Sequence, residues 1–220
     1  MQLPSRAYLA IKNNMTESIF KHASKTAITL IVFAFVFTAL LAFIFNITKA
    51  PIDKAEANAR LALFGQIVPP NTHDNDLIKD TINIAPNVLL GNTQAMVANR
   101  ARLNKVPQAI ILEAIAHDGY SGDIKLLIAI NYDGSIAGVR VLTHKETPGL
   151  GDYIDLAKDN WIKLFNGESL KKTVDAQWQV KKDGGKFDYM AGATITPRAV
   201  VKAVNLALQY FEANKMALFA

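Results

Sequence analysis

One stretch, residues 27–47, contains no charged side chain and restricts what this chain can fold into. As a helix rising about 1.5 Å per residue it is about 30 Å long, the thickness of a bilayer's hydrocarbon core. Thr29 and Thr38 can bond carbonyls of their own helix, and Asn46 lies near the far end. A buried globular helix would have a polar face, and a cleaved signal sequence has a shorter apolar segment. We therefore predict an uncleaved transmembrane helix.

The charges beside this span predict its orientation. The preceding segment has one acid, Glu17, against four basic residues: Arg6, Lys12, Lys21 and Lys25. Because loops rich in Lys and Arg stay on the cytoplasmic side, residues 1–26 are predicted to be a cytoplasmic tail. Residues 48–70 would form a stalk helix and linker, and residues 71–220 an exported domain. In a bacterial inner membrane this single-pass topology places that domain in the periplasm.

Composition excludes several classes of function. The chain has no cysteine, which excludes thiolate catalysis, disulfides and cysteine-ligated metal clusters. Its four histidines are too dispersed for a helical metal pair, so we expect no metal site. The net charge is +5, but no basic run interleaved with aromatic residues predicts nucleic-acid binding. Redox chemistry in such a chain requires an organic cofactor.

The exported part has the pattern of one α+β domain with an antiparallel sheet and flanking helices. Asp118-Gly119 and Asp133-Gly134 separate β-rich runs, which predicts hairpin turns. Residues 71–107 are predicted to be loops with short strands. The other predicted elements are a stalk helix over 52–67 that ends before Pro69 and Pro70, strands at 109–116, 124–132 and 136–144, a helix over 152–165, a strand pair at 178–180 and 187–190, and a last helix from Pro197 to about Lys215.

A first candidate site follows the third of these strands. Its residues form the sequence Glu-Thr-Pro-Gly-Leu-Gly, in which proline and glycine favour a rigid turn with outward-facing N–H groups. Such a turn can face an aromatic ring system or an anion, although an ordinary strand-to-helix connection has the same composition. The candidate residues are Glu146, Thr147, Gly149, Leu150 and Gly151.

A second candidate site, residues 188–197, precedes the last predicted helix. Thr196 stands where an N-cap is expected and Pro197 at the first helical position. Gly192 and Ala193 leave the backbone open to a ligand, and a phosphate on Thr196 would meet the N–H groups at the helix N-terminus. A purely structural reading, in which the hydroxyl caps the helix, stays open at this point.

The second segment resembles the flavinylation motif Asp-x-x-Ser/Thr-Gly-Ala-Thr-x-Thr of FMN-binding domains. With the upstream Glu-Thr-Pro-Gly-Leu-Gly and the single span, nearly the whole chain resembles the RnfG family, the G subunits of the Rnf (Rsx) ion-translocating electron transport complex. The resemblance implies FMN joined to Thr196 through a phosphoester by a flavin transferase that uses FAD, with residues 146–151 lining the flavin. Ala191 stands where the motif has Ser or Thr. The implied recognition residues are Asp188, Gly192, Ala193 and Thr194.

This resemblance implies an electron-carrying flavoprotein that is not catalytic alone. Its implied partners are the other subunits of the complex, the flavin transferase during maturation, and the membrane, with no nucleic acid. One alternative is the equivalent C subunit of the sodium-translocating NADH:quinone reductase, which has both motifs but is usually longer. A second alternative is a membrane-anchored periplasmic binding module without flavin, in which the second segment is only a helix cap.

Overall fold

The computed structural model of the chain describes residues 5–220. The first four residues of the predicted cytoplasmic tail lie outside the described residues. The chain divides into two compact units, Met1–Glu56 and Ala57–Ala220. Helix α1, Ser5–Ile67, forms the first unit and contributes its last turns to the second. It ends just before the proline pair, as predicted.

Within the described residues, one helical section, Lys21–Ile67, is long and apolar enough to cross a membrane. The large apolar side chains of residues 28–47 are exposed, as a surface that faces lipid requires. The hydroxyls of Thr29 and Thr38 donate to the carbonyl oxygens of Lys25 and Ala34, at 2.9 and 2.7 Å. These bonds satisfy both hydroxyls inside their own helix.

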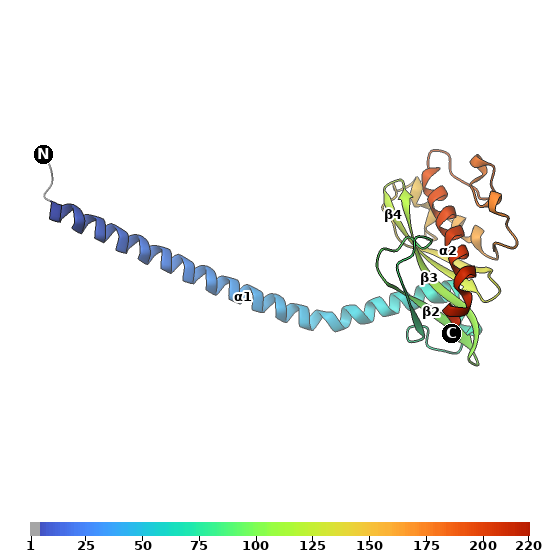
Figure 1. The fold of residues 1–220 in the computed structure, drawn as a ribbon, viewed down its shortest axis with the longest axis horizontal. Coiled ribbons are helices and arrows are strands. Elements are labelled where there is room, and N and C mark those ends of the chain that lie inside the picture. Colours follow the sequence, from blue (N-terminus) through green and yellow to red (C-terminus); the bar gives the residue numbers. More distant parts are fainter. Residues whose placement is uncertain (1–4) are drawn as a thin grey trace. The chain divides into compact units, whose positions relative to one another are not determined.

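The second unit is built on one antiparallel sheet in the order β1-β2-β3-β4-β5, with the long helix α2 across it (Figure 1). The predicted α+β class, with an antiparallel sheet and flanking helices, is therefore confirmed. The bounds are Thr81–Ile84 for β1, Met96–Leu103 for β2, Val106–Gly119 for β3, Gly122–Asn131 for β4, Ile136–Thr143 for β5 and Ile195–Phe219 for α2.

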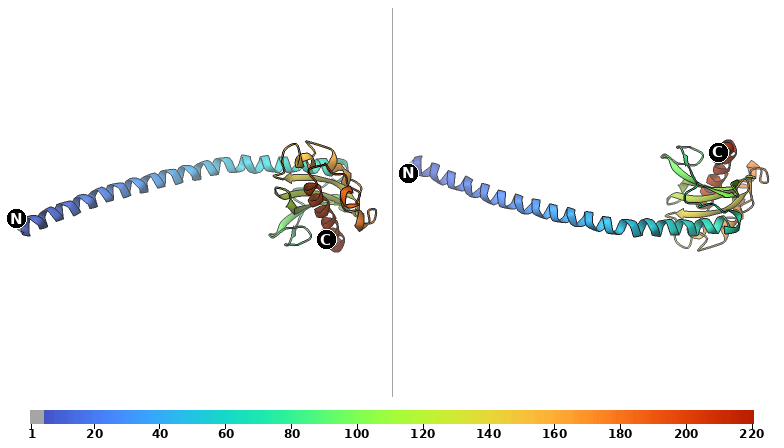
Figure 2. Two further views of the ribbon diagram at one scale, coloured as in Figure 1. Left: turned by 90° about the horizontal axis from the view of Figure 1, so that it is seen from above. Right: turned by 90° about the horizontal axis from the view of Figure 1, so that it is seen from below.

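Both faces of the sheet are covered. Figure 2 shows the last turns of α1 and helix α2 on opposite sides of the strands. On β3, Ile110 packs in the core cluster with α2, and the next residue, Ile111, packs in the cluster that contains Phe64 and Ile67 of α1. Because successive strand residues face opposite sides, a strand buried on both faces reads as a continuous apolar run. Burying each such side chain stabilises the fold by about 1.5–3 kcal/mol.

The two central hairpin turns were predicted with unequal accuracy. Gly134 has a φ of +93°, and the turn around it joins β4 to β5 as predicted. The other turn was placed wrongly, because Asp118 and Gly119 still belong to β3. Gly119 pairs with Gly122, which leaves Tyr120 and Ser121 as the turn residues.

The predicted helix over 152–165 is wrong. Two 3₁₀ helices, Gly151–Ile154 and Trp161–Phe165, lie there instead. Between them the carboxylates of Asp155 and Asp159 each accept a hydrogen bond from the backbone N–H two residues later, at 3.0 and 2.7 Å. Such local bonds offer the backbone an alternative to the helix, which explains why apolar residues at helical spacing did not form one.

The predicted strand pair at 178–180 and 187–190 is also wrong. It is reduced to one isolated parallel bridge between Val180 and Phe187. A 3₁₀ helix, Lys181–Asp183, occupies the connection and ends on a left-handed glycine with a φ of +87°. The segment is therefore a compact loop and not a hairpin.

The buried side chain of Glu168 connects several residues of this irregular region. Its buried carboxylate binds the Thr173 hydroxyl, Lys186 Nζ at 2.5 Å and Lys172 Nζ at 2.9 Å. Burial alone would raise the pKa of Glu168, but the hydrogen bonds from these three side chains lower it from 4.5 to about 2. The stabilisation that this shift represents is present above the unfolded pKa and is lost as the pH falls towards 2.

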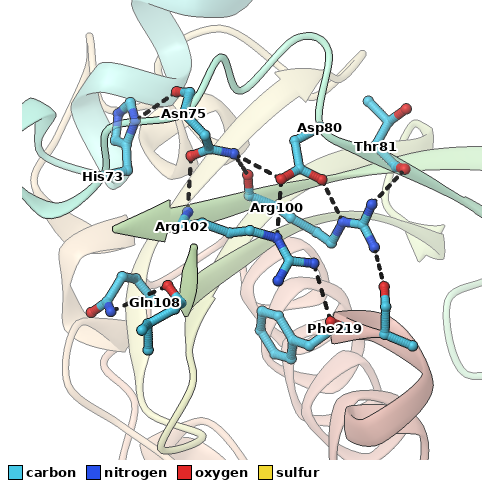
Figure 3. Close-up of polar contacts among 10 residues, drawn as sticks. His73, Asn75, Asp80, Thr81, Arg100, Arg102, Gln108 and Phe219 are labelled. Atoms are coloured by element: carbon cyan, nitrogen blue, oxygen red, sulfur yellow. Dashed lines mark hydrogen bonds and ion pairs between the residues drawn. The ribbon is translucent and has the colours of Figure 1, made fainter. Parts of the chain in front are cut away.

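A polar network joins the start of β1 to β2 and to the end of α2 (Figure 3). The Asp80 carboxylate accepts from Arg100 Nε at 2.6 Å and from Arg102 Nε at 3.1 Å. The same two guanidinium groups donate to the backbone carbonyls of Ala220 and Phe219, at 2.6 and 3.1 Å. The end of α2, whose other end lies at the candidate site, is thereby attached to the sheet.

Candidate functional site

A cavity of about 320 Å³ lies where the β3–β4 turn, the loop after β5 and the start of α2 meet. It brings together both sequence motifs, which are separated by about forty residues along the chain. Its wall is formed by Tyr120, Glu146, Thr147, Leu150, Gly151, Gly192, Ala193, Thr194, Ile195 and Thr196.

A buried hydroxyl–carboxylate pair forms the polar part of this wall. Thr196 is 1 % exposed and Glu146 is 4 % exposed. The Thr196 hydroxyl donates a hydrogen bond to Glu146 Oε2, and the Ser121 backbone N–H donates to Oε1 at 3.1 Å. The backbone N–H of Glu146 donates to His144 Nδ1 at 3.1 Å. Both carboxylate oxygens therefore have partners, as burial requires.

The predicted N-cap at Thr196 is wrong. Helix α2 begins at Ile195, and its N-cap is Thr194, whose side chain makes no capping hydrogen bond. Thr196 lies in the first helical turn, and Pro197 follows it there. A proline is tolerated throughout this turn because its missing N–H would have had no helical partner. The Thr196 hydroxyl is bound to Glu146 and not to its own helix.

The absence of a side chain at Gly151 allows the two motifs to be in contact. A Cβ atom at this position would lie 2.8 Å from Glu146 Oε2 and 2.9 Å from Thr196 Oγ1. Gly119 is similarly close, since its Cβ would lie 3.0 Å from Glu146 Oε1. All three distances are shorter than ordinary van der Waals contact, so the hydroxyl–carboxylate pair depends on the absence of side chains at Gly151 and Gly119.

The turn in the first motif is closed by its own hydrogen bonds, so the prediction that its N–H groups face outward is wrong for Gly149, Leu150 and Gly151. The backbone N–H groups of Leu150 and Gly151 both donate to the Thr147 carbonyl at 3.1 Å. Gly149 adopts a φ of +77° and donates its N–H to Asp152 Oδ1 at 2.7 Å. Gly149 lies off the cavity wall, as does Asp188 of the second motif, whereas the other predicted site residues line it.

Two wall residues, Tyr120 and Ile195, have no signal in either motif. Tyr120 belongs to the hairpin turn, which reaches the site only because β3 and β4 are both long. Ile195 is 45 % exposed and Tyr120 is 67 % exposed, and they add apolar surface beside Leu150, which is 46 % exposed. The cavity therefore combines a polar floor with an apolar rim.

Side chains from the 3₁₀ helices hold the backbone of the second motif. Trp161 Nε1 donates to the Asp188 carbonyl at 2.7 Å, and the Met190 N–H donates to the Tyr153 hydroxyl at 3.3 Å. Burial raises the pKa of Tyr153 to about 12, which keeps its hydroxyl protonated at neutral pH. Asp188 itself forms an ion pair with Lys181. The segment that approaches the cavity is thus fixed from outside it.

The charges near the start of α2 are already paired. Arg198 binds Asp183 through two hydrogen bonds of 2.6 and 2.5 Å, and Lys202 binds Asp118 at 2.7 Å. The first N–H groups of the helix have no intrahelical acceptor and leave a partial positive charge at its N-terminus. This end of the cavity therefore suits an anion through backbone groups, because Arg198 and Lys202 are already paired with aspartates.

The antiparallel sheet, the cavity at the start of its long helix, the preceding apolar helix and the family matches together place this chain among FMN-binding domain proteins with a candidate membrane span. Residues 119–209 match the family model described as an FMN-binding domain, and this range contains the whole cavity wall. Residues 15–67 match the model described as the RnfG N-terminal region. The chain belongs to the RnfG family, the G subunits of ion-translocating oxidoreductase complexes.

Full-length relatives support this assignment. The G subunit of the ion-translocating oxidoreductase complex of Pseudomonas aeruginosa strain UCBPP-PA14 is 46% identical over 89% of this chain and 92% of its own length. The G subunits from Vibrio atlanticus and Shewanella loihica are each 45% identical, over 89% and 93% of this chain and 93% and 94% of their own lengths. The similarity therefore extends through both the anchor and the domain.

Proposed function

We propose that this chain carries FMN covalently on Thr196 and passes electrons between that flavin and neighbouring subunits of an ion-translocating membrane complex. The observation that supports attachment at Thr196 is the position of its hydroxyl. It lies in the wall of a cavity inside the FMN-binding domain, at the first turn of α2 and in contact with a buried carboxylate.

The residues of the cavity fit the two chemically different parts of FMN. The backbone N–H groups at the start of α2 suit a phosphate. The exposed apolar side chains of Leu150, Ile195 and Tyr120 suit an aromatic ring system. Gly151 has no room for a side chain beside Glu146 and Thr196, whereas a Cβ at Gly192 would meet open space. When bound, FMN supplies the capacity to accept and release electrons, and the chain supplies its position and surroundings.

The proposed maturation needs a flavin transferase that uses FAD as the donor. Glu146, Thr147, Gly149, Leu150 and Gly151 form the loop proposed to line the flavin. The proposed recognition context on the attachment side is Asp188, Gly192, Ala193 and Thr194. A tether keeps the cofactor from being lost to the outside, which a carrier exposed on the trans side of a membrane requires.

Wild-type chain purified in detergent after co-expression with a flavin transferase is expected to gain the mass of FMN less one water. The label should stay with the chain after denaturation, and peptide mapping should place it between Lys186 and Arg198. Chain expressed without the transferase is the control and should have no label. Wild-type chain that stays unlabelled in both samples would contradict covalent attachment.

The topology is also a proposal. Lys and Arg outnumber acids before the span, so we infer that the N-terminus lies in the cytoplasm of a bacterial cell and residues 48–220 lie in the periplasm. Protease added to intact spheroplasts is expected to digest the C-terminal domain, detected with an antibody to it, and to spare an N-terminal tag. Protection of the domain until the membrane is permeabilised would contradict this orientation.

A further inference from the structure

The hydrogen bond between Thr196 and Glu146 bears on the attachment reaction itself. A threonine hydroxyl is a weak nucleophile at its free pKa and reacts when an adjacent group accepts its proton. Glu146 is in hydrogen-bond contact with the Thr196 oxygen, and the two residues line the same cavity. The carboxylate is also held from its other side by the Ser121 N–H, so its position does not depend on Thr196 alone.

We propose that Glu146 is the general base that activates Thr196 when FMN is attached, so that the acceptor chain supplies this group itself. This rests on the proposed attachment at Thr196. In the reaction, Thr196 Oγ forms a bond to the FMN-side phosphorus of FAD, the bond from that phosphorus to the bridging diphosphate oxygen breaks, and AMP leaves. The hydroxyl proton passes to Glu146 Oε2 and from there to water. No electrons are exchanged, and the transferase supplies the FAD.

Several other titratable groups near Thr196 already have partners elsewhere. Arg198 and Lys202 form ion pairs with aspartates, and Asp152 accepts from the Gly149 N–H. His144 Nδ1 accepts from the backbone N–H of Glu146. Among the described residues, the carboxylate that contacts the Thr196 hydroxyl is Glu146.

The chain contains a second buried threonine–carboxylate pair that serves as an internal comparison. Thr173 donates to Glu168, as Thr196 does to Glu146, and all four side chains are buried. Glu168, however, is held by two lysines and lies outside the cavity, whereas no ion pair among the described residues involves Glu146. A charge already neutralised by lysines is a poor proton acceptor, so of these two pairs the Glu146 pair combines a carboxylate outside any ion pair with a place in the cavity wall.

The test is the rate of flavin attachment to the full-length chain in detergent, with purified transferase and FAD, followed by intact mass. Glu146→Gln keeps the size and hydrogen-bonding capacity of the side chain but cannot accept the proton. Its kcat is expected to fall by about 100-fold or more, the usual contribution of a general base. The KM for the acceptor chain should change little, because Glu146 is 4 % exposed and offers almost no surface to the transferase.

Two further variants separate the base from a structural role. Glu146→Asp retains a carboxylate and is expected to recover at least about tenfold of the rate lost in Glu146→Gln. Glu168→Gln is the matched control, with the same substitution in the other buried pair. It is expected to lower thermal stability, because Glu168 is held by Lys172 and Lys186, and to leave the attachment rate within about twofold of wild type when assayed below its unfolding temperature.

The outcomes are distinguishable. A folded Glu146→Gln variant modified at the wild-type rate, or slowed only through a higher KM, overturns the role of Glu146 and leaves attachment at Thr196 intact. If Glu146→Gln does not fold by circular dichroism, Glu146→Ala, which also lacks the carboxylate, decides, and a wild-type kcat or an effect on KM alone in that variant overturns the proposal. Wild-type chain that gains no FMN at Thr196 overturns both the proposed function and this inference.

Discussion

Thr196→Val is expected to abolish covalent flavin in chain co-expressed with the transferase, measured by intact mass and by fluorescence of the denatured chain. The substitution keeps the branched shape in a position that is 1 % exposed but removes the nucleophilic oxygen. Thr196→Ser restores that oxygen and is expected to restore labelling. Because a phosphoester cannot form without the hydroxyl, the expected loss is complete and not partial.

Thr194→Val is the control for Thr196→Val, since Thr194 lies in the same cavity wall and makes no capping hydrogen bond. It should retain at least some covalent flavin. Thr196→Val leaves one oxygen of the buried Glu146 carboxylate without its donor, at a cost of about 1–3 kcal/mol, so folding must be verified by circular dichroism. Covalent FMN on folded Thr196→Val, or its loss only in Thr194→Val, would show that the attachment residue is misassigned.

Gly151→Ala is expected to reduce both covalent labelling and stability. The new Cβ would lie 2.8 Å from Glu146 Oε2 and 2.9 Å from Thr196 Oγ1, which are buried atoms with little freedom to move. Separating them breaks the hydrogen bond that joins the two motifs. Overpacking of this kind costs about 1–3 kcal/mol, measurable as a lower midpoint in denaturant unfolding. The yield of FMN per chain is measured on the same preparations.

Gly149→Ala provides the comparison within the same loop. A Cβ at Gly149 would meet no atom within 4 Å, so the expected cost is the backbone strain at a φ of +77°, about 1–2 kcal/mol. The residue lies off the cavity wall, and labelling should stay at the wild-type level. Equal labelling in the two variants at equal stability would show that the space beside Thr196 and Glu146 is not critical.

The elements that sequence patterns predicted best are those with local causes. The β4–β5 turn follows from the Asp-Gly pair at 133–134, and the end of α1 follows from the proline pair. The two motifs meet in one cavity because one directly follows β5 and the other directly precedes α2. Here local chemistry and tertiary structure agree.

The errors arose where side chains bind distant or competing partners. Strand β2 has an indistinct apolar pattern because Arg100 and Arg102 pair with Asp80, which lies far back in the chain. The start of α2 was misplaced because a threonine before a proline is typical of an N-cap. The Thr196 hydroxyl instead binds Glu146, a partner fifty residues away. Such partners are defined only after the fold brings them together.

The contribution of α1 to the core determines how this protein can be divided. The folded unit begins at Ala57, and Phe64 and Ile67 are 0% and 2% exposed within it. A soluble fragment that starts after Ile67 would uncover the apolar face formed by residues such as Ala101 and Leu127. A chimera that takes the membrane span from one relative and the FMN-binding domain from another therefore needs its junction before Ala57. The last turns of α1 must then come from the same protein as the domain.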